Sequence, residues 1–416
     1  MPSRTFHRAV FAAVFATLVG CGSSSTRAFE DSAPPDAGGG EPPGAFPEAG
    51  VAPSGEVVGH LTGNVMAPNG KIPIAGAVLY LTDTRPAATP EKVFCDACVQ
   101  LSAESPYALS DDKGAFVLGP TKLGAQFLVL QKGGFRRVRE IYVSKGDAAL
   151  PPTLVTLPSR TDLAAGDEIP RMTVVHGQYD EIEASLEKLG IDREAIETVQ
   201  SALIGVAAKS FLTDSTRVNA RHIVFLPCGD FTQPAPNTDL ASEVAIQDNL
   251  RSFVNAGGRL YVTDWHYDFI ARTFPGYINW SGGGSAPCSG CDRIAYDVPA
   301  SLEDTGLASW MSAQSLATFT LQRNYTTIAS VNPVATTGPD GAPKIVTPHV
   351  WVSGAKAGGA KHPATVSFEQ GCGRVLFSSY HTEPFSLELA PQERALLGVL
   401  LEASVCVASP TGVVIK

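Results

Sequence analysis

The hydrophobic pattern changes near residue 160, and this change constrains the fold more than any other feature of the sequence. Between residues 55 and 157, short apolar runs of strand character are separated by turn residues. From residue 168 onward, near-continuous apolar runs alternate with helical segments that carry one apolar face. The first pattern favours an all-β sandwich, and the second favours a mostly parallel sheet with helices on both faces. We therefore predict a multi-domain chain with an N-terminal all-β unit at 55–157 and a C-terminal α/β unit at 168–416.

The composition is that of a globular protein with many turns. The 416 residues include 40 Gly and 31 Pro, and 44% are hydrophobic while 17% are charged,. The net charge is −10 and no basic run is present. Surfaces that bind nucleic acids are built from clustered Lys and Arg, so this class of partner is excluded.

The first 54 residues indicate a cellular location. Two arginines precede an apolar run at residues 9–19, which is shorter than the roughly 20 residues needed to span a bilayer and is typical of a signal-peptide core. The run ends in Leu18-Val19-Gly20-Cys21, which resembles the bacterial lipobox. The resemblance implies a signal peptide at 1–20, a diacylglycerol on Cys21, and a protein held to a bacterial membrane in the cell envelope. The alternative is an ordinary signal peptide followed by a chance cysteine.

Residues 21–54 consist largely of Gly, Pro, Ala and Ser. Such a composition buries too little apolar surface to offset the entropy of ordering, so we predict a flexible tether.

The all-β unit carries a recognisable order of pieces. Strands are expected at residues 57–65, 77–82, 115–118, 126–132 and 137–143. The turn Asp111-Asp112-Lys113-Gly114 also predicts a hairpin between residues 107–109 and 115–118.

The segments 63–65, 73–78, 110–116 and 132–135 resemble the carboxypeptidase regulatory-like family, a transthyretin-like sandwich. The resemblance implies an accessory module that packs on another domain or binds carbohydrate or protein, without catalytic residues.

The α/β unit is predicted from alternating strands and helices. Strands are expected at 172–176, 223–226, 259–263 and 374–378, with helices at 179–189, about 240–256, and from Pro391 onward. Ligands of such sheets bind at the carboxyl ends of the strands. We therefore predict a polar crevice lined by His176, Tyr179, Asp180, Asp264, Trp265, His266 and Asp268.

The segments 255–263 and 371–383 resemble the class I glutamine amidotransferase-like fold, a flavodoxin-like arrangement that includes trehalose-utilisation-protein-like relatives. In active members a Gly-x-Cys-x-Gly elbow supplies a thiolate, and a late His and Glu supply the base and its orienting group. His381 and Glu383 match the second motif. The elbow position holds Thr263-Asp264-Trp265-His266, without a thiol or flanking glycines. The resemblance therefore favours a non-enzymatic domain, and we predict no metal and no cofactor.

Two other chemistries stay open. Cys228 lies at a strand end before Gly229, so a hydrolase or amidase using Cys228, His381 and Glu383 is one alternative, against a small buried residue at the sheet edge. Asp264, His266 and Asp268, with His176 or His381, have the donor types of a divalent cation site. The competing interpretation is that Asp264 caps the following helix.

Aromatic residues near the predicted crevice offer a third alternative. Trp265, Tyr267 and Trp280 could stack on a sugar ring, or they could belong to the core.

The seven cysteines after Cys21 suggest disulfides, because thiols outside the cytosol tend to pair. We expect three pairs and leave Cys228 unpaired: Cys95 with Cys98, Cys288 with Cys291, and Cys372 with Cys406.

Together these observations predict a lipid-anchored cell-envelope protein with a non-catalytic binding or scaffolding role, whose partners are the bilayer and an envelope glycan or protein. The alternatives are the Cys-dependent hydrolase and a carbohydrate-binding envelope lipoprotein.

Overall fold

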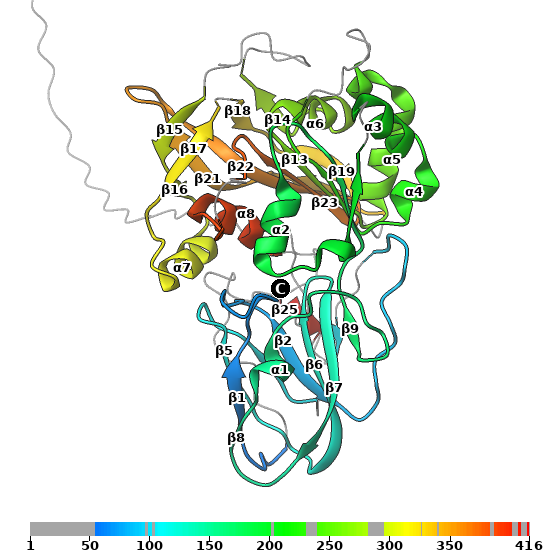
Figure 1. Cartoon of the computed structure of the whole chain (residues 1–416), viewed down its shortest axis with the longest axis vertical. Helices are drawn as coiled ribbons and strands as arrows, with labels where there is room; N and C mark the ends of the chain where they lie inside the picture. Colours follow the sequence, from blue (N-terminus) through cyan, green and yellow to red (C-terminus); the bar gives the residue numbers. More distant parts are fainter. Residues whose placement is uncertain are drawn as a thin grey trace, which may run out of the picture.

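The computed structural model describes most of the chain after residue 54. The described residues are 55–95, 99–101, 105–200, 204–229, 239–281, 295–325, 327–338, 341–382, 387–401, 407–408 and 414–415. The predicted signal peptide, tether and lipidated Cys21 lie outside these residues. Figure 1 shows a mixed α/β molecule, with the strands of the N-terminal unit at one end and a larger sheet with helices at the other.

Two sheets make up the N-terminal unit. The larger has the order β4-β2-β6-β7-β9 and the smaller the order β5-β1-β8. Their bounds are β1 Leu61–Asn64, β2 Val78–Thr82, β4 Tyr107–Leu109, β5 Ala115–Leu118, β6 Gly124–Lys132, β7 Phe135–Val143, β8 Ala148–Ala149 and β9 Asp167–Glu168. The short helix α1 (Pro152–Val155) follows β8.

The expected hairpin at residues 107–118 is wrong. The turn forms, because the side chain of Asp111 accepts hydrogen bonds from the backbone of Lys113 and Ala115. However, β4 pairs with β2 while β5 pairs with β1, so this turn carries the chain from one sheet to the other. The unit also extends beyond residue 157, because β9 pairs with β7.

An eight-stranded mixed sheet forms the C-terminal unit, in the order β11-β10-β12-β13-β23-β22-β21-β16. The first five strands are parallel and the remaining three are antiparallel. Their bounds are β10 Met172–Val175, β11 Ile196–Val199, β12 Ile223–Leu226, β13 Arg259–Thr263, β16 Ser301–Leu302, β21 His349–Ala355, β22 Lys361–Gln370 and β23 Gly373–Ser378.

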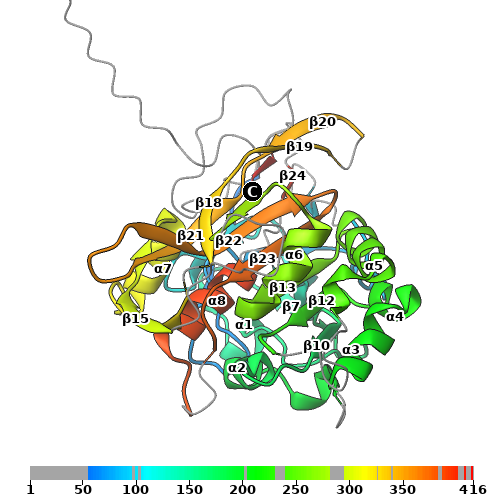
Figure 2. The same cartoon turned by 90° about the horizontal axis from the view of Figure 1, so that it is seen from above.

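Helices cover both faces of this sheet. Their bounds are α2 Ile182–Leu189, α3 Ile204–Leu212, α4 Ser215–Asn219, α5 Val244–Asn255, α6 Tyr267–Thr273, α7 Thr305–Ala313 and α8 Pro391–Leu401, with short 3-10 turns η2 Arg193–Ala195, η3 Leu240–Ser242 and η4 Asp264–His266. In Figure 2, α3, α4 and α5 lie together beside the parallel strands. The helix α2 ends where predicted, because Gly190 adopts a left-handed conformation with φ +100°,.

The alternation of strand residues divides the core into two layers. Val175, Val224 and Val262 belong to the cluster that includes α3, α5 and α6. Val174 and Phe225 belong to the opposite cluster, which contains α2, α7 and α8 and continues into the core of the N-terminal unit. The two units therefore share one apolar layer, whose burial favours a fixed arrangement.

Short strand pairs complete the described part of the chain. β14 (Ile278–Trp280) pairs with β18 (Ile328–Val331), β15 (Tyr296–Pro299) with β17 (Thr320–Asn324), and β19 (Val334–Thr337) with β20 (Pro343–Val346). Near the C-terminus, β24 (Val407–Ala408) pairs with β25 (Val414–Ile415) and with β3 (Val99–Gln100). The last strands thus return to the N-terminal part of the chain.

A disulfide joins Cys95 to Cys372, with their Cα atoms 5.2 Å apart. The expected pairs Cys95–Cys98 and Cys372–Cys406 are therefore wrong. Cys372 lies in the turn before β23, and its backbone N–H donates to the carbonyl oxygen of Asn255 at the end of α5. The disulfide therefore links Cys95 to this end of α5. Cys98, Cys288, Cys291 and Cys406 lie outside the described residues, and Cys228 is a free, buried thiol.

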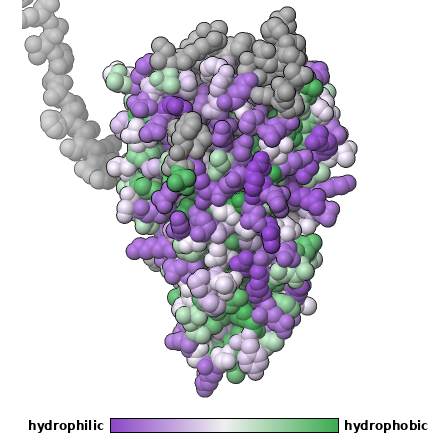
Figure 3. All heavy atoms as spheres, viewed as in Figure 1, coloured by the Kyte–Doolittle hydropathy of each residue, from purple (hydrophilic) through white to green (hydrophobic). Residues whose placement is uncertain are grey.

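The surface is largely hydrophilic on the face shown in Figure 3, where hydrophobic residues form small groups among polar ones. None of the described helices has the length and apolar character that crossing a bilayer requires.

Candidate functional site

The parallel strands β10, β12, β13 and β23 end close together. The buried aspartate Asp180 joins the ends of β10, β13 and β23. Asp180, which follows β10, accepts a hydrogen bond from the Thr263 hydroxyl at the end of β13 at 2.7 Å. Its other oxygen accepts from the backbone N–H of Thr382, after β23, at 3.0 Å and from the hydroxyl of the same residue. Thr263 in turn accepts from the backbone N–H of Cys228, after β12, at 2.8 Å.

Close backbone contact also positions these ends. A Cβ on Gly177 would lie 2.2 Å from the carbonyl oxygen of Cys228, so any side chain there would force the loops after β10 and β12 apart,. The backbone N–H of Tyr179 donates to the same carbonyl at 3.1 Å.

Asp264 occupies the turn that directly follows β13, and its backbone is strained. Its φ is +42°, in the left-handed region that residues other than glycine seldom adopt,. Strain of this kind costs about 1–3 kcal/mol and is concentrated at functional sites. The turn therefore has the backbone strain of a nucleophile elbow although flanking glycines are missing.

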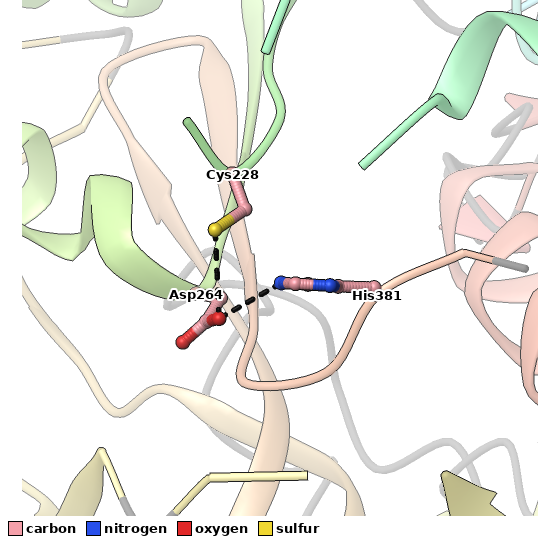
Figure 4. Close-up of side chains that lie close together, drawn as sticks. All are labelled: Cys228, Asp264 and His381. Atoms are coloured by element: carbon pink, nitrogen blue, oxygen red, sulfur yellow. Dashed lines mark hydrogen bonds and ion pairs between the residues drawn. The ribbon is translucent and has the colours of Figure 1, made fainter. Parts of the chain in front are cut away.

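The side chain of Asp264 contacts two partners from neighbouring strand ends (Figure 4). The Nε2 atom of His381 lies 2.8 Å from Oδ2, and the thiol of Cys228 donates to the same oxygen at 3.5 Å. Asp264 is 1% exposed and makes no helix-capping bond. The helix-capping interpretation of Asp264 is therefore wrong.

The second oxygen, Oδ1, is buried and accepts no hydrogen bond from the described residues.

Burial dominates the electrostatics of this cluster. It raises the pKa of Asp264, although the contacts with His381 and Cys228 oppose the increase,. Burial would lower the pKa of His381, but the hydrogen bond to Asp264 and the charge of Asp180 raise it overall. Burial and the neighbouring carboxylate of Asp264 raise the pKa of the Cys228 thiol far above its ordinary value, although the backbone N–H of Trp265 opposes them.

The predicted triad is only partly assembled. Sγ of Cys228 and a ring nitrogen of His381 lie within 4.8 Å of each other, but each makes its described hydrogen bond with Asp264. Glu383 lies outside the described residues. Among the described residues, the third member of the cluster with Cys228 and His381 is Asp264.

The predicted cation set of Asp264, His266 and Asp268 does not come together. Within the described residues, the group with metal-ligand geometry consists of Cys228, Asp264 and His381. His266 packs edge-on against Phe269 at 5.6 Å, and Asp268 faces Asp239 and Arg272.

His176 lies 3.0 Å from Glu183 of α2 and is not a member of this group.

The aromatic residues divide into surface and core. Tyr179 and Trp265 are 48% and 44% exposed, and their rings meet edge-to-face at 5.5 Å. Trp280 is buried against Tyr267 and Phe377, so Tyr267 and Trp280 belong to the core.

Three residues of the site had no role predicted from the sequence. Thr263 and Thr382 bind Asp180, and the ring of Tyr325 lies 6.2 Å from that of His381. Thr263 and Thr382 carried a signal, because each lies at or just beyond a predicted strand end. Tyr325 follows the short strand β17, which no sequence pattern indicated.

No family model and no curated protein matches the chain. Similar solved structures include a putative ThuA-like protein from Bacteroides uniformis, with 10% identity, 55% of this chain and 89% of that chain covered, and a TM-score of 0.31. A cytoplasmic protein from Salmonella typhimurium has 11% identity, coverage of 55% and 96%, and a TM-score of 0.31.

A GH42 beta-galactosidase from G. stearothermophilus has 13% identity, 57% of this chain covered, and a TM-score of 0.30. The chain spans 30% of the length of that enzyme. Trehalose-utilisation-like proteins are thus among the similar structures, at low identity.

Proposed function

We propose that the protein is a lipid-anchored binding protein of the bacterial cell envelope, whose amidotransferase-like domain does not perform thiol-dependent acyl transfer. The absence of acyl transfer rests on one observation: the buried thiol of Cys228 donates to the carboxylate of Asp264, which occupies the elbow position. The anchor rests on the lipobox-like segment that ends at Cys21. A nucleophilic cysteine needs a base or cation that stabilises its thiolate. A carboxylate has the opposite effect, because a thiolate beside it would be a second negative charge.

The strand arrangement supports the two domain types in this proposal. The parallel strands β11-β10-β12-β13-β23 follow the 2-1-3-4-5 order of flavodoxin-like sheets,. The two sheets of the N-terminal unit are consistent with a transthyretin-like sandwich, and we propose that this unit is an accessory module.

The Cys-dependent hydrolase is the rival that this geometry disfavours. We expect no ammonia release from glutamine and no labelling of native protein by a thiol-directed activity probe. The matched variants are Cys228→Ala and His381→Ala. Labelling or ammonia release in the wild type that disappears in both variants would establish the hydrolase and remove the proposal.

Carbohydrate binding is a second candidate, favoured by the exposed aromatic pair Tyr179 and Trp265 near the strand ends. Two such rings offer an apolar surface with a fixed relative orientation, suited to stacking on a sugar. Glycan-array and peptidoglycan pull-down binding should be lost in Trp265→Ala and Tyr179→Ala. It should persist in Tyr142→Ala, a control aromatic residue that is 77% exposed on the N-terminal unit. Binding that survives both site variants would count against this candidate.

The anchoring is tested separately. We expect the full chain expressed in a bacterium to incorporate labelled fatty acid and to partition with detergent, and Cys21→Ser to do neither. Cys228→Ser is the matched control and should behave as the wild type. An unlabelled wild-type chain would contradict the anchor.

A further inference from the structure

We propose that Cys228, Asp264 and His381 form a binding site for a thiophilic divalent cation, with zinc as the ion to be tested. This inference goes beyond the proposed binding function and does not depend on it. One ligating atom from each residue lies within 4.8 Å of the other two, and all three side chains are buried. Figure 4 shows that they converge from three separate strand ends.

The sulfur–oxygen distance matches tetrahedral zinc, and the nitrogen–oxygen distance is shorter than zinc requires. Zinc lies about 2.3 Å from thiolate sulfur and about 2.0 Å from nitrogen or oxygen, which places sulfur and oxygen ligands about 3.5 Å apart and nitrogen and oxygen about 3.3 Å apart. In the structure Sγ is 3.5 Å from Oδ2 of Asp264, and Nε2 of His381 is 2.8 Å from the same oxygen. Binding would require these last two atoms to separate by about half an ångström.

The charge balance of the cluster also favours a cation. Oδ2 of Asp264 faces both partners, whereas Oδ1 points away from them (Figure 4) and has no hydrogen bond from the described residues. The other charged groups that act on His381 are Asp180 and Arg323, and Asp180 is already bonded to Thr263 and Thr382. A divalent ion would neutralise Asp264 and a thiolate together, because it displaces the thiol proton to solvent.

Hydrogen bonds to the backbone of two ligand residues hold the strand ends that carry them. The backbone N–H of Cys228 donates to Thr263, and Gln392 of α8 donates to the carbonyl oxygen of His381 at 2.7 Å. The backbone N–H of Trp265 faces the sulfur and favours its ionised form,.

The donor set selects the type of ion. Thiolate and imidazole are ligands of zinc, copper or cobalt, whereas magnesium and calcium prefer oxygen. Three protein ligands leave a fourth position for water or another donor.

The test uses the tag-free full chain, stripped with a chelator, loaded with Zn²⁺ or Co²⁺ and desalted. We expect one equivalent of zinc by mass spectrometry. The cobalt form should show tetrahedral d–d bands and a thiolate-to-cobalt charge-transfer band. Cys228→Ser should abolish the charge-transfer band, and Cys228→Ser and His381→Ala should each weaken zinc binding by at least about 100-fold.

His349→Ala is the matched control. His349 lies 3.2 Å from the carboxylate of Asp304, so it reproduces the His–Asp contact at a different place in the fold. This variant should bind zinc as the wild type does. Circular dichroism would establish that each variant is folded.

X-ray absorption of the zinc-loaded wild type keeps the proposal testable if a variant does not fold. We expect one sulfur ligand at about 2.3 Å and nitrogen or oxygen ligands at about 2.0 Å. A wild type without stoichiometric zinc, a zinc shell without sulfur, or a charge-transfer band retained in Cys228→Ser would each overturn the proposal. The thiol-probe and glutamine assays test the proposed function separately.

Discussion

Two shielded carboxylates, Asp167 and Asp264, have opposite electrostatic surroundings. Asp167 is 13% exposed and binds Arg137 and Arg139, each at 2.8 Å. Burial raises its pKa, but the two guanidinium groups outweigh this and lower the pKa overall. Asp264 is more deeply buried, and burial raises its pKa although its contacts with an imidazole and a thiol oppose the increase.

The difference separates a structural carboxylate from a candidate functional one. Asp167 fastens β9 to β7 and its charge is fully compensated. Asp264 is kept in a strained backbone conformation with an uncompensated oxygen. Buried ionisable groups that are held at a cost in stability are over-represented at functional sites.

Among the charged residues, the largest expected effect on stability is at the arginine cluster. Asp167→Ala should lower the free energy of unfolding by about 2–3 kcal/mol, between the values typical of exposed and fully buried pairs, because it leaves two arginines without their anion. Urea denaturation measures this. Asp83→Ala is the control, since its contact with Lys122 is exposed, and should cost less than about 1 kcal/mol,. An equal loss of unfolding free energy in both variants would contradict the structural role of Asp167.

The two sites should also respond to pH with opposite signs. A lowered pKa means that Asp167 stabilises the fold above its unfolded pKa of about 3.9, and that this contribution is lost as the pH falls through the lower folded pKa. Asp264 and His381 have raised pKa values, so protonation of either group favours the folded state. The contribution of His381 increases as the pH falls through its raised folded pKa toward about 6.5, and that of Asp264 increases as the pH falls toward about 3.9.

Asp264→Asn should therefore gain less stability than the wild type as the pH falls from 8 toward about 6.5. It should also lower the pKa of His381, measured from the imidazole resonances in NMR spectra. An unchanged His381 titration would contradict the contact between these two residues.

Asp268 is a second carboxylate with a raised pKa. Burial and the nearby Asp239 raise the pKa of Asp268 to about 6, although Arg272 opposes them. The charged form is disfavoured in the folded state, so the cost is present above pH 6 and disappears as the pH falls toward 4. Asp268→Asn should be more stable than the wild type by about 1 kcal/mol at pH 8 and equally stable at pH 4. If Asp268→Asn were more stable than the wild type at pH 4 but not at pH 8, the raised pKa of Asp268 would be contradicted.

The smallest effect on stability is expected at the exposed aromatic pair. Trp265→Ala should lower the free energy of unfolding by about 1 kcal/mol or less, because the side chain is 44% exposed and its ring contacts Tyr179 alone among the described aromatic rings,. Trp280→Ala should cost about 3–5 kcal/mol, because that ring is buried,. Thermal unfolding of both variants distinguishes the surface ring from the core ring.

Parallel strands were predictable because strands buried on both faces leave continuous apolar runs in the sequence. Residues 259–263 match β13, and residues 223–226 match β12. The antiparallel strands β21 and β22 were not predicted, because Ser353 in β21 and Thr365 and Ser367 in β22 interrupt their apolar runs. The hairpin failed because a local turn does not determine which sheet each flanking strand joins.

The site was predictable in its members but not in its contacts. Strand ends selected Asp264, His381 and Cys228 from the sequence. Which of these atoms meet depends on pairing between residues 36 to 117 positions apart, and no local pattern records it. The same limit explains the disulfide, whose cysteines are separated by 277 residues.

The rate at which iodoacetamide modifies Cys228 in the native full chain tests the central claim most directly, with a chelator present so that bound metal cannot protect the sulfur. The account predicts no modification at pH 7 and complete modification after unfolding, because the thiol is buried and held neutral by Asp264,. Rapid modification of Cys228 in the folded chain, slowed by His381→Ala, would show an activated thiolate and contradict the account.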